Sequence, residues 1–186
     1  MTTNDYSLLL HACENGDVAQ VKQLMGGDIT IEQYGYALDT VAHSGHVEAA
    51  QCLLPWCERK YIDGVLINAC VQEHTHVVAC LVEAKALEHY DSPLQWAAKY
   101  GHSKIVDILI PVSNPQAENN LALRWAVQHQ HTAVVQQLIA HSNCKAALRE
   151  LKRQGYETQV LENEMQKQRL LSAVAPVEKP LGVRKM

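Results

Sequence analysis

The chain has 186 residues, of which 47% are hydrophobic and 19% are charged, with a formal net charge of -4 at pH 7. These values are ordinary for a soluble globular protein and exclude global disorder, and the length allows a core that buries about 70% of the extended-chain surface. Residues 1–50 carry seven acidic and one basic side chain, whereas residues 151–186 carry four acidic and seven basic ones. A basic tail could contact nucleic acid, but its carboxylates dilute its cations, so this is the least favoured function.

The six cysteines include no C-x-x-C pair, which excludes a zinc ribbon or a thioredoxin motif and fits a reducing compartment. The first residues lack a positive segment followed by an apolar run, and no 18 consecutive residues are apolar. We therefore expect a cytoplasmic monomer without a signal peptide or a membrane span. A non-cleaved secretion signal of the bacterial kind would escape this test.

A helix-turn-helix pattern recurs five times between residues 6 and 140. Its clearest copy is residues 92–110, where two short helical patterns flank a turn at Gly101. We call this turn residue the anchor. The equivalent anchors follow one another at intervals of 29, 28, 28 and 29 residues: Gly16, Gly45, Glu73, Gly101 and Gln130.

The same apolar residues flank every anchor. Seven residues before each anchor is a leucine: Leu9, Leu38, Leu66, Leu94 and Leu123. Four residues before each anchor is a small or β-branched residue: Ala12, Val41, Ala69, Ala97 and Ala126. Five and eight residues after it stand the pairs Val21 and Leu24, Ala50 and Leu53, Val78 and Leu81, Val106 and Leu109, and Val135 and Leu138. This spacing places each pair on one face of a helix. Because such helices are too short to be stable alone, we expect neighbouring repeats to share one core.

Residues 92–110 resemble the ankyrin repeat, whose first helix reads T-P-L-H-x-A-A and whose second follows G-H with V-V-x-x-L-L. Residues 9–24 and 38–54 are similar to it as well. The resemblance implies an all-α, right-handed α-solenoid of stacked helix-turn-helix repeats that binds a protein partner. An ankyrin unit has about 33 residues. Four or five are missing here from each connection, so we expect truncated loops in place of β-hairpins, at residues 26–35, 55–63, 83–91 and 111–119.

We predict a single solenoid domain over residues 1–172, with repeats at about 6–33, 34–62, 63–90, 91–119 and 120–144. Residues 145–172 are expected to form two capping helices with Gly155 at the anchor place, because a solenoid needs a polar outer face at its end. Residues 173–186 contain two prolines and no periodicity, which predicts a flexible tail.

Ten histidines suggest a metal site, most sharply through the four that follow an anchor: His46, His74, His102 and His131. Equivalent residues of stacked helices lie roughly 8–10 Å apart, whereas each zinc ligand must come within about 2.1 Å of the ion. This spacing argues against a metal site, and we predict no metal and no cofactor. The four histidines match the G-H dipeptide of the ankyrin repeat, and the resemblance implies that they hold the turns.

Among the cysteines, Cys13 and Cys70 stand where the family has alanine, which indicates small buried residues. Cys57 and Cys144 lie in connections and could be exposed. The sequence contains no phosphate-binding, dinucleotide-binding, serine-hydrolase or zinc-protease motif, so we predict no enzyme and no catalytic residue. The alternative is an ankyrin-containing bacterial effector, delivered into a host cell, or an enzyme that uses a Cys/His site or the C-terminal region.

The resemblance places the two residues before each anchor on the concave face of the stack. These residues differ from repeat to repeat while the core does not, which is typical of a recognition surface. Trp96 and Trp125 share the place five before the anchor; packing between repeats explains them, and the alternative is an aromatic anchor for a partner. The predicted partner-binding residues are Glu14, Asn15, His43, Ser44, Val71, Gln72, Trp96, Lys99, Tyr100, Trp125, Gln128 and His129.

Overall fold

A computed structural model describes residues 3–84 and 89–174 of the chain, and within them it contains twelve α-helices and no strand. The first helices of the successive pairs are α1 (Thr3–Asn15), α3 (Ile31–Ser44), α5 (Arg59–Val71), α7 (Asp91–Tyr100), α9 (Ala117–Gln128) and α11 (Cys144–Arg153). The second helices are α2 (Val18–Leu24), α4 (Val47–Leu53), α6 (Thr75–Glu83), α8 (Ser103–Leu109), α10 (Thr132–Leu138) and α12 (Gln159–Val174).

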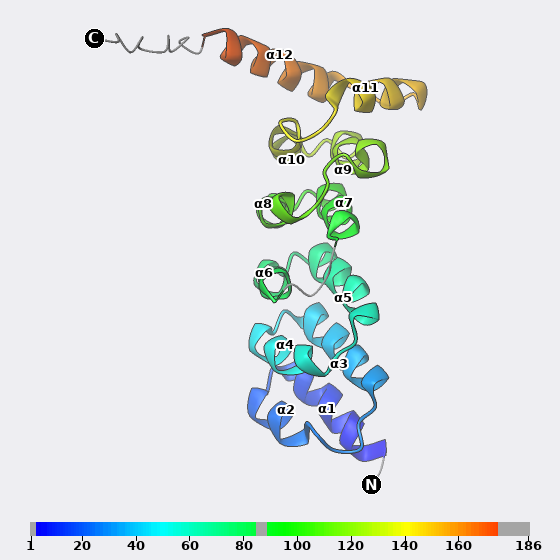
Figure 1. Ribbon diagram of the computed structural model, residues 1–186, viewed down its shortest axis with the longest axis vertical. Helices are drawn as coiled ribbons and strands as arrows, with labels where there is room; N and C mark the ends of the chain where they lie inside the picture. Colours follow the sequence, from blue (N-terminus) through cyan, green and yellow to red (C-terminus); the bar gives the residue numbers. More distant parts are fainter. Residues whose placement is uncertain (1–2, 85–88, 175–186) are drawn as a thin grey trace, which may run out of the picture.

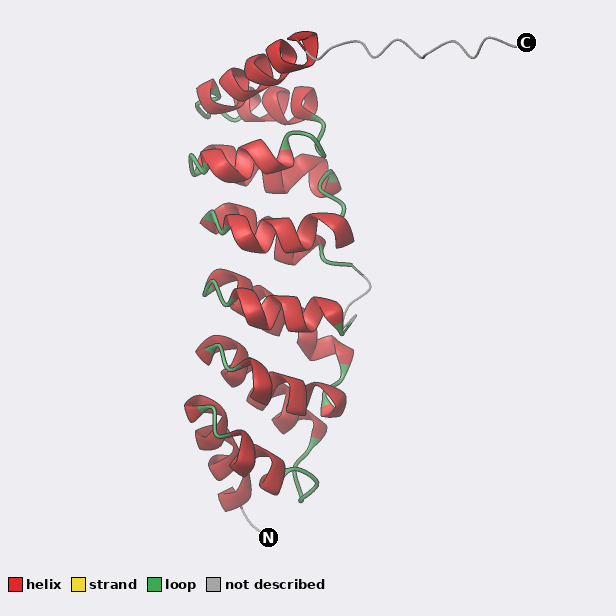
Figure 2. Cartoon of the chain, turned by 90° about the vertical axis from the view of Figure 1, so that its left-hand side faces the viewer, coloured by secondary structure: helices red, strands yellow, loops and turns green. Residues whose placement is uncertain are grey.

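The helix pairs stack into one column in chain order (Figure 1). First helices pack on first helices of the adjacent layers and second helices on second helices, which is the arrangement of an α-solenoid. Figure 2 shows the tight turns within the pairs along one edge of the column and the longer connections between pairs along the other. We call these the turn edge and the connection edge.

The rows of apolar residues predicted from the spacing form the core. Every leucine seven before an anchor and every residue four before it is fully or almost fully buried. The second-helix rows are buried as well, except that Leu24 of the first layer is only partly covered. Burying a leucine fully stabilises the fold by roughly 1.5–3 kcal/mol. Because each layer contributes the same set, the core runs unbroken through the stack.

All five anchors adopt the left-handed backbone conformation, whether or not they are glycine. The φ angles are 68° at Gly16, 79° at Gly45 and 80° at Gly101, and they remain positive at Glu73 (62°) and Gln130 (59°). A left-handed residue lets the chain leave one helix and enter the next within two residues. The two repeats that lack the glycine signature are therefore true repeats, as their register predicted.

The connections are short, as expected, and two of them contain single 3-10 turns, η1 (Leu54–Trp56) and η2 (Ile110–Val112). Helices α3 and α5 begin several residues earlier than the spacing suggested, so residues 31–35 and 59–63 are helical. Thr30 explains the first case, because it forms a capping box with Gln33 at the start of α3. In α9, residues 118–120 have positive φ angles, so regular helix starts after the predicted connection.

Helices α11 and α12 form a sixth layer, with Gly155 in the left-handed conformation at the predicted anchor place. In this layer Leu151 fills the buried position that alanine or valine fills elsewhere. We propose that this pair caps the stack. The predicted tail lies outside the described residues from residue 175 onward, since α12 continues to Val174. Among the described helices, none is long and apolar enough to cross a membrane.

Candidate functional site

The histidines that follow the anchors fix the C-terminal ends of the first helices. Each ring points its Nε2 at the carbonyl oxygen of the residue two before the preceding anchor, so Nε2 must donate the hydrogen bond. The pairs and their N···O distances are His46 with Glu14 (3.0 Å), His74 with His43 (2.7 Å), His102 with Val71 (3.2 Å) and His131 with Lys99 (2.9 Å). The histidines thus hold the neighbouring layer, not only their own turn, and the residues that they fix are predicted partner-binding residues.

Glycine anchors make room for these rings. A Cβ atom added at Gly101 would lie 2.5 Å from Nδ1 of His131, and the same contact would arise at Gly16 and Gly45 with the histidine of the next layer. At Glu73 the side chain is present, and there the His102 hydrogen bond is the longest of the four. The turn edge is therefore built from a left-handed residue and a histidine that covers it.

Four of the predicted partner-binding residues come together on α7 and α9. The ring centroids of Trp96 and Trp125 are 5.6 Å apart, and Tyr100 stacks at 6.1 Å from Trp96. Lys99 extends across all three rings, with its Nζ 4.4 Å from the centroid of Trp96, 5.1 Å from Trp125 and 5.8 Å from Tyr100. We call these four residues the aromatic cluster.

The aromatic cluster lies at the surface but is held from below. Tyr100 is 45% exposed, whereas Trp96, Lys99 and Trp125 are half-buried. The Tyr100 ring stacks on His102, and the Lys99 carbonyl accepts the hydrogen bond of His131. The tryptophans therefore pack between two repeats and also form part of an accessible surface. Their role as an aromatic anchor for a partner stays a prediction.

The other predicted residues do not join the cluster. The side chains of Glu14 and Asn15 contact His11 of the same helix, where Asn15 donates to the His11 carbonyl oxygen at 2.8 Å. His43 and Gln72 link two layers through a 3.3 Å contact between His43 Nδ1 and Gln72 Nε2. The remaining four are spread along the stack: Ser44 and Val71 are half-buried at helix ends, Gln128 lines a hollow beside Tyr156, and His129 stacks on His131.

A second part of the same face was not predicted. Tyr36, Asp39 and Tyr61 line a hollow of about 320 Å³ between α3 and α5, and Tyr36 is 63% exposed. Asn68 donates to Asp39 there at 2.6 Å. These residues stand five to twelve places before an anchor. The repeat register is the signal that could have identified them, because the same helix face continues toward the start of each first helix.

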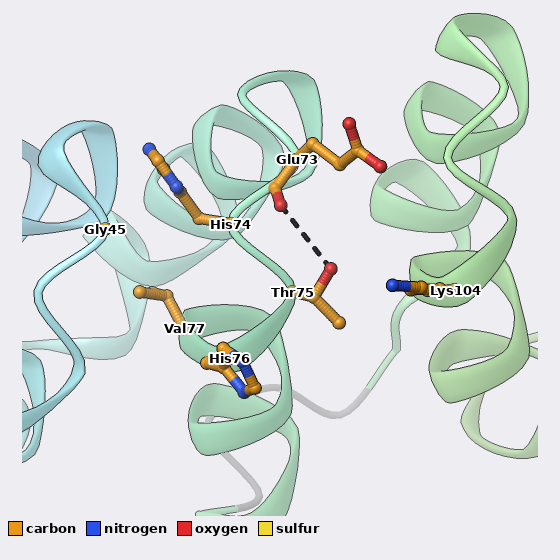
Figure 3. A pocket seen from close by; sticks show the side chains of 7 residues that line it. All are labelled: Gly45, Glu73, His74, Thr75, His76, Val77 and Lys104. Carbon is orange, nitrogen blue, oxygen red and sulfur yellow. Dashed lines mark hydrogen bonds between the residues drawn. The ribbon is translucent and has the colours of Figure 1, made fainter.

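A hollow on the turn edge lies beside His74 and His76 at the start of α6 (Figure 3). Its charged side chains are Glu73 and Lys104, which approach from adjacent layers and carry opposite signs. Thr75 bonds only to the Glu73 carbonyl oxygen, and His74 is committed to His43. The polar groups of this hollow are thus mostly used to hold turns together.

Thiol chemistry would need a cysteine with a lowered pKa. Burial instead raises the pKa values of Cys13, Cys57 and Cys70 to about 12, and it raises that of Cys144 as well. Cys57 is half-buried, and its Sγ donates to the carbonyl oxygens of Tyr34 and Leu53, both at 3.3 Å. These thiols are structural donors or core residues.

Comparison with known proteins agrees with this architecture. A family model described as ankyrin repeats (3 copies) matches residues 40–119 and 66–150. Among solved structures, the human ASB11 ankyrin repeat domain superposes with a TM-score of 0.62 at 22% sequence identity, over 92% of this chain and 85% of that chain. At this identity the likeness concerns the fold alone. Comparison with curated protein sequences gives no match.

Proposed function

Because the chain belongs to the ankyrin-repeat family, whose repeats generally serve as protein-interaction modules, we propose that it binds a protein partner through its first helices. The surface concerned consists of the exposed side chains of α1, α3, α5, α7 and α9, and we call it the first-helix face. We propose that it is the concave face of the stack. The aromatic cluster is its energetic centre.

One observation carries this proposal: four residues from two adjacent repeats, Trp96, Lys99, Tyr100 and Trp125, form one accessible cluster on a rigid base. Aromatic residues are enriched among those that dominate the binding energy of interfaces, particularly at the centre of the contact. Preorganisation adds to this, because side chains already held by stacking lose little conformational entropy on binding.

The net charge of the first helices changes from negative to positive along the stack, which supports binding of a partner in one orientation. The basic and acidic side chains give net charges of -2 in each of α1 and α3, +1 in α5, 0 in each of α7 and α9, and +3 in α11. Such a gradient favours one orientation of a charged partner and accelerates its association. A partner segment would therefore place its basic part near the N-terminal layers and its acidic part near the C-terminal ones.

Site-specific photocrosslinking tests the proposed face. We would replace Tyr100 with the photoreactive amino acid p-benzoylphenylalanine and irradiate the tagged protein in native lysate. Trp56 is the matched control, because it is 46% exposed, close to the 45% of Tyr100, but belongs to η1 on the connection edge. We expect a specific crosslinked protein from the Tyr100 position. Crosslinks from position 56 alone would move the interface away from the cluster.

A further inference from the structure

The aromatic cluster contains a cation without an acidic partner. Lys99 makes cation–π contacts with three rings, and the ring faces attract its positive charge. Within residues 3–84 and 89–174, no carboxylate lies within ion-pair distance of its ammonium group. The aromatic rings orient the charge but do not neutralise it.

The acids of the same two helices are occupied elsewhere. Asp91 Oδ1 accepts a hydrogen bond from the backbone of Asn114 at 2.6 Å, and Glu118 Oε1 accepts from Gln95 Nε2 at 3.3 Å. Both stand at the start of their helices, whereas Lys99 stands at the end of α7. Eight residues of helix separate Asp91 from Lys99, which is about 12 Å. Neither acid of these two helices therefore pairs with Lys99, and its ammonium group is available to an anionic ligand.

The cluster also offers hydrogen-bond donors almost exclusively. Lys99 has three ammonium N–H groups, Trp96 and Trp125 have one indole N–H each, and Tyr100 has a hydroxyl that can donate. In the described part of the chain, none of these groups has a hydrogen-bond partner. A ligand that fits this set must supply acceptor oxygens and a negative charge, with apolar atoms that cover the ring faces.

We propose that the aromatic cluster binds a carboxylate side chain of an acidic partner segment, whose neighbouring apolar residue packs on Trp96 and Trp125. The inference rests on the proposed function and names the chemistry of its partner. Lys99 would form a charge-assisted hydrogen bond with the carboxylate, and the indole N–H groups would provide further donors.

Two other ligand types fit the cluster less well. A phosphate group carries a charge of about -1.5 to -2 and is usually bound by several cations, whereas the cluster has one ammonium group. A partner cation could stack on the rings only by expelling Lys99, and it would still be repelled by that charge. A single carboxylate matches both the charge and the donors that are present.

Nuclear magnetic resonance of the indole N–H groups tests the proposal on the full chain. The probes are acetyl-Leu-Glu-Glu-Leu-amide and its Gln-Gln and Lys-Lys analogues, titrated while the Trp96 and Trp125 signals are followed. We expect the acidic peptide to bind at least about tenfold more tightly than the neutral one, since hydrogen bonds to charged groups are worth more than neutral ones. Salt should weaken this preference.

Two variants separate the role of Lys99 from general electrostatics. Lys99→Met keeps the length of the side chain and should abolish the preference for the acidic peptide, whereas Lys104→Met removes an exposed lysine of α8 and should preserve it. Equal affinities for the three peptides, or a preference that survives Lys99→Met, would overturn the proposal. Tighter binding of the Lys-Lys peptide would also overturn it and would identify a cation site.

The partner itself distinguishes this inference from the proposed function. If Trp96→Ala/Tyr100→Ala weakens partner binding but Lys99→Met leaves it unchanged, the first-helix face is the binding surface but its ligand is not a carboxylate. If neither variant affects the partner, the proposed face fails as well.

Discussion

The turn edge and the connection edge join the same layers by different means. On the turn edge one device is used four times, a histidine that donates to the carbonyl oxygen of the preceding layer. On the connection edge the donor changes each time: Cys57 Sγ donates to Tyr34, Ser113 Oγ donates to Tyr90 at 2.9 Å, and the Asn143 backbone donates to the Asn120 side chain at 2.7 Å. The three pairs are each 23 residues apart, so the spacing is kept while the chemistry varies.

The difference reflects what each edge has to position. A left-handed anchor followed by a histidine fixes the end of a first helix, and the exposed residues just before the anchor belong to the first-helix face. The connection edge only has to satisfy buried carbonyl groups, which several donors can do. Uniform geometry on the turn edge thus provides a rigid base for the side chains that vary.

The largest expected effect is the low reactivity of the Cys57 thiol on the connection edge. With its pKa raised to about 12 by burial, the Cys57 thiol is ionised to only about one part in ten thousand at pH 8, against roughly a quarter for an ordinary thiol. We therefore expect maleimide to label Cys57 in the native protein on the order of a thousand times more slowly than a free thiol. Mass spectrometry of timed samples measures this. Fast labelling of Cys57 would instead favour the Cys/His alternative.

Gly101→Ala is expected to have the largest effect on stability at the turn edge. The left-handed backbone costs an alanine roughly 1–2 kcal/mol, and the new Cβ would also displace the His131 ring, so we expect a loss of about 2 kcal/mol or more. Gly64→Ala is the control: it lies within α5 with open space around it, and alanine should stabilise the helix by roughly 0.5–1 kcal/mol. Urea unfolding of both variants compares them. Equal effects would disprove the role of the anchor.

His131→Ala removes one histidine from the turn edge without introducing a clash. Loss of its 2.9 Å hydrogen bond to the Lys99 carbonyl oxygen should cost about 1 kcal/mol. Ser113→Ala removes a comparable bond from the connection edge and should cost a similar amount. Of the two variants, only His131→Ala should also weaken partner binding, because His131 contacts the aromatic cluster and Ser113 does not. Equal binding by the two variants would show that the edges do not differ in function.

Gln130→Gly should change the stability of the fold least, and it should raise it. Glycine relieves a left-handed strain of roughly 1–2 kcal/mol but loses about 0.5–1 kcal/mol to the greater backbone entropy of the unfolded chain. The net result is a stabilisation of a few tenths of a kcal/mol to about 1 kcal/mol. A rise in the thermal midpoint would report it. A destabilised Gln130→Gly variant would mean that the Gln130 side chain contributes a contact of its own.

The fold was predictable because its core follows the chain at a fixed interval. The leucines at 9, 38, 66, 94 and 123 could be aligned by counting, and every one of them is buried. Even Glu73 and Gln130 were placed correctly as anchors, since position in the repeat overrides residue type there. The starts of α3 and α5 were missed, because caps such as Thr30 act locally and do not recur in the other repeats.

The candidate site was predictable only in part. Sequence register identified Trp96, Lys99, Tyr100 and Trp125 as candidate partner-binding residues of adjacent repeats, but not that Lys99 crosses all three rings. That arrangement depends on side-chain rotamers and on the distance between layers, neither of which is written in the spacing. For the same reason the histidines were expected at their own turns, whereas their partners lie one layer earlier.

The most direct test of the account is the affinity of the captured partner for the Trp96→Ala/Tyr100→Ala variant. Trp56→Ala is the control, since Trp56 is also an exposed tryptophan, at 46%, but belongs to η1 on the connection edge. We predict a loss of a few kcal/mol of binding free energy for the double variant, with unchanged circular dichroism, and wild-type affinity for Trp56→Ala. Wild-type affinity of the double variant would contradict the account.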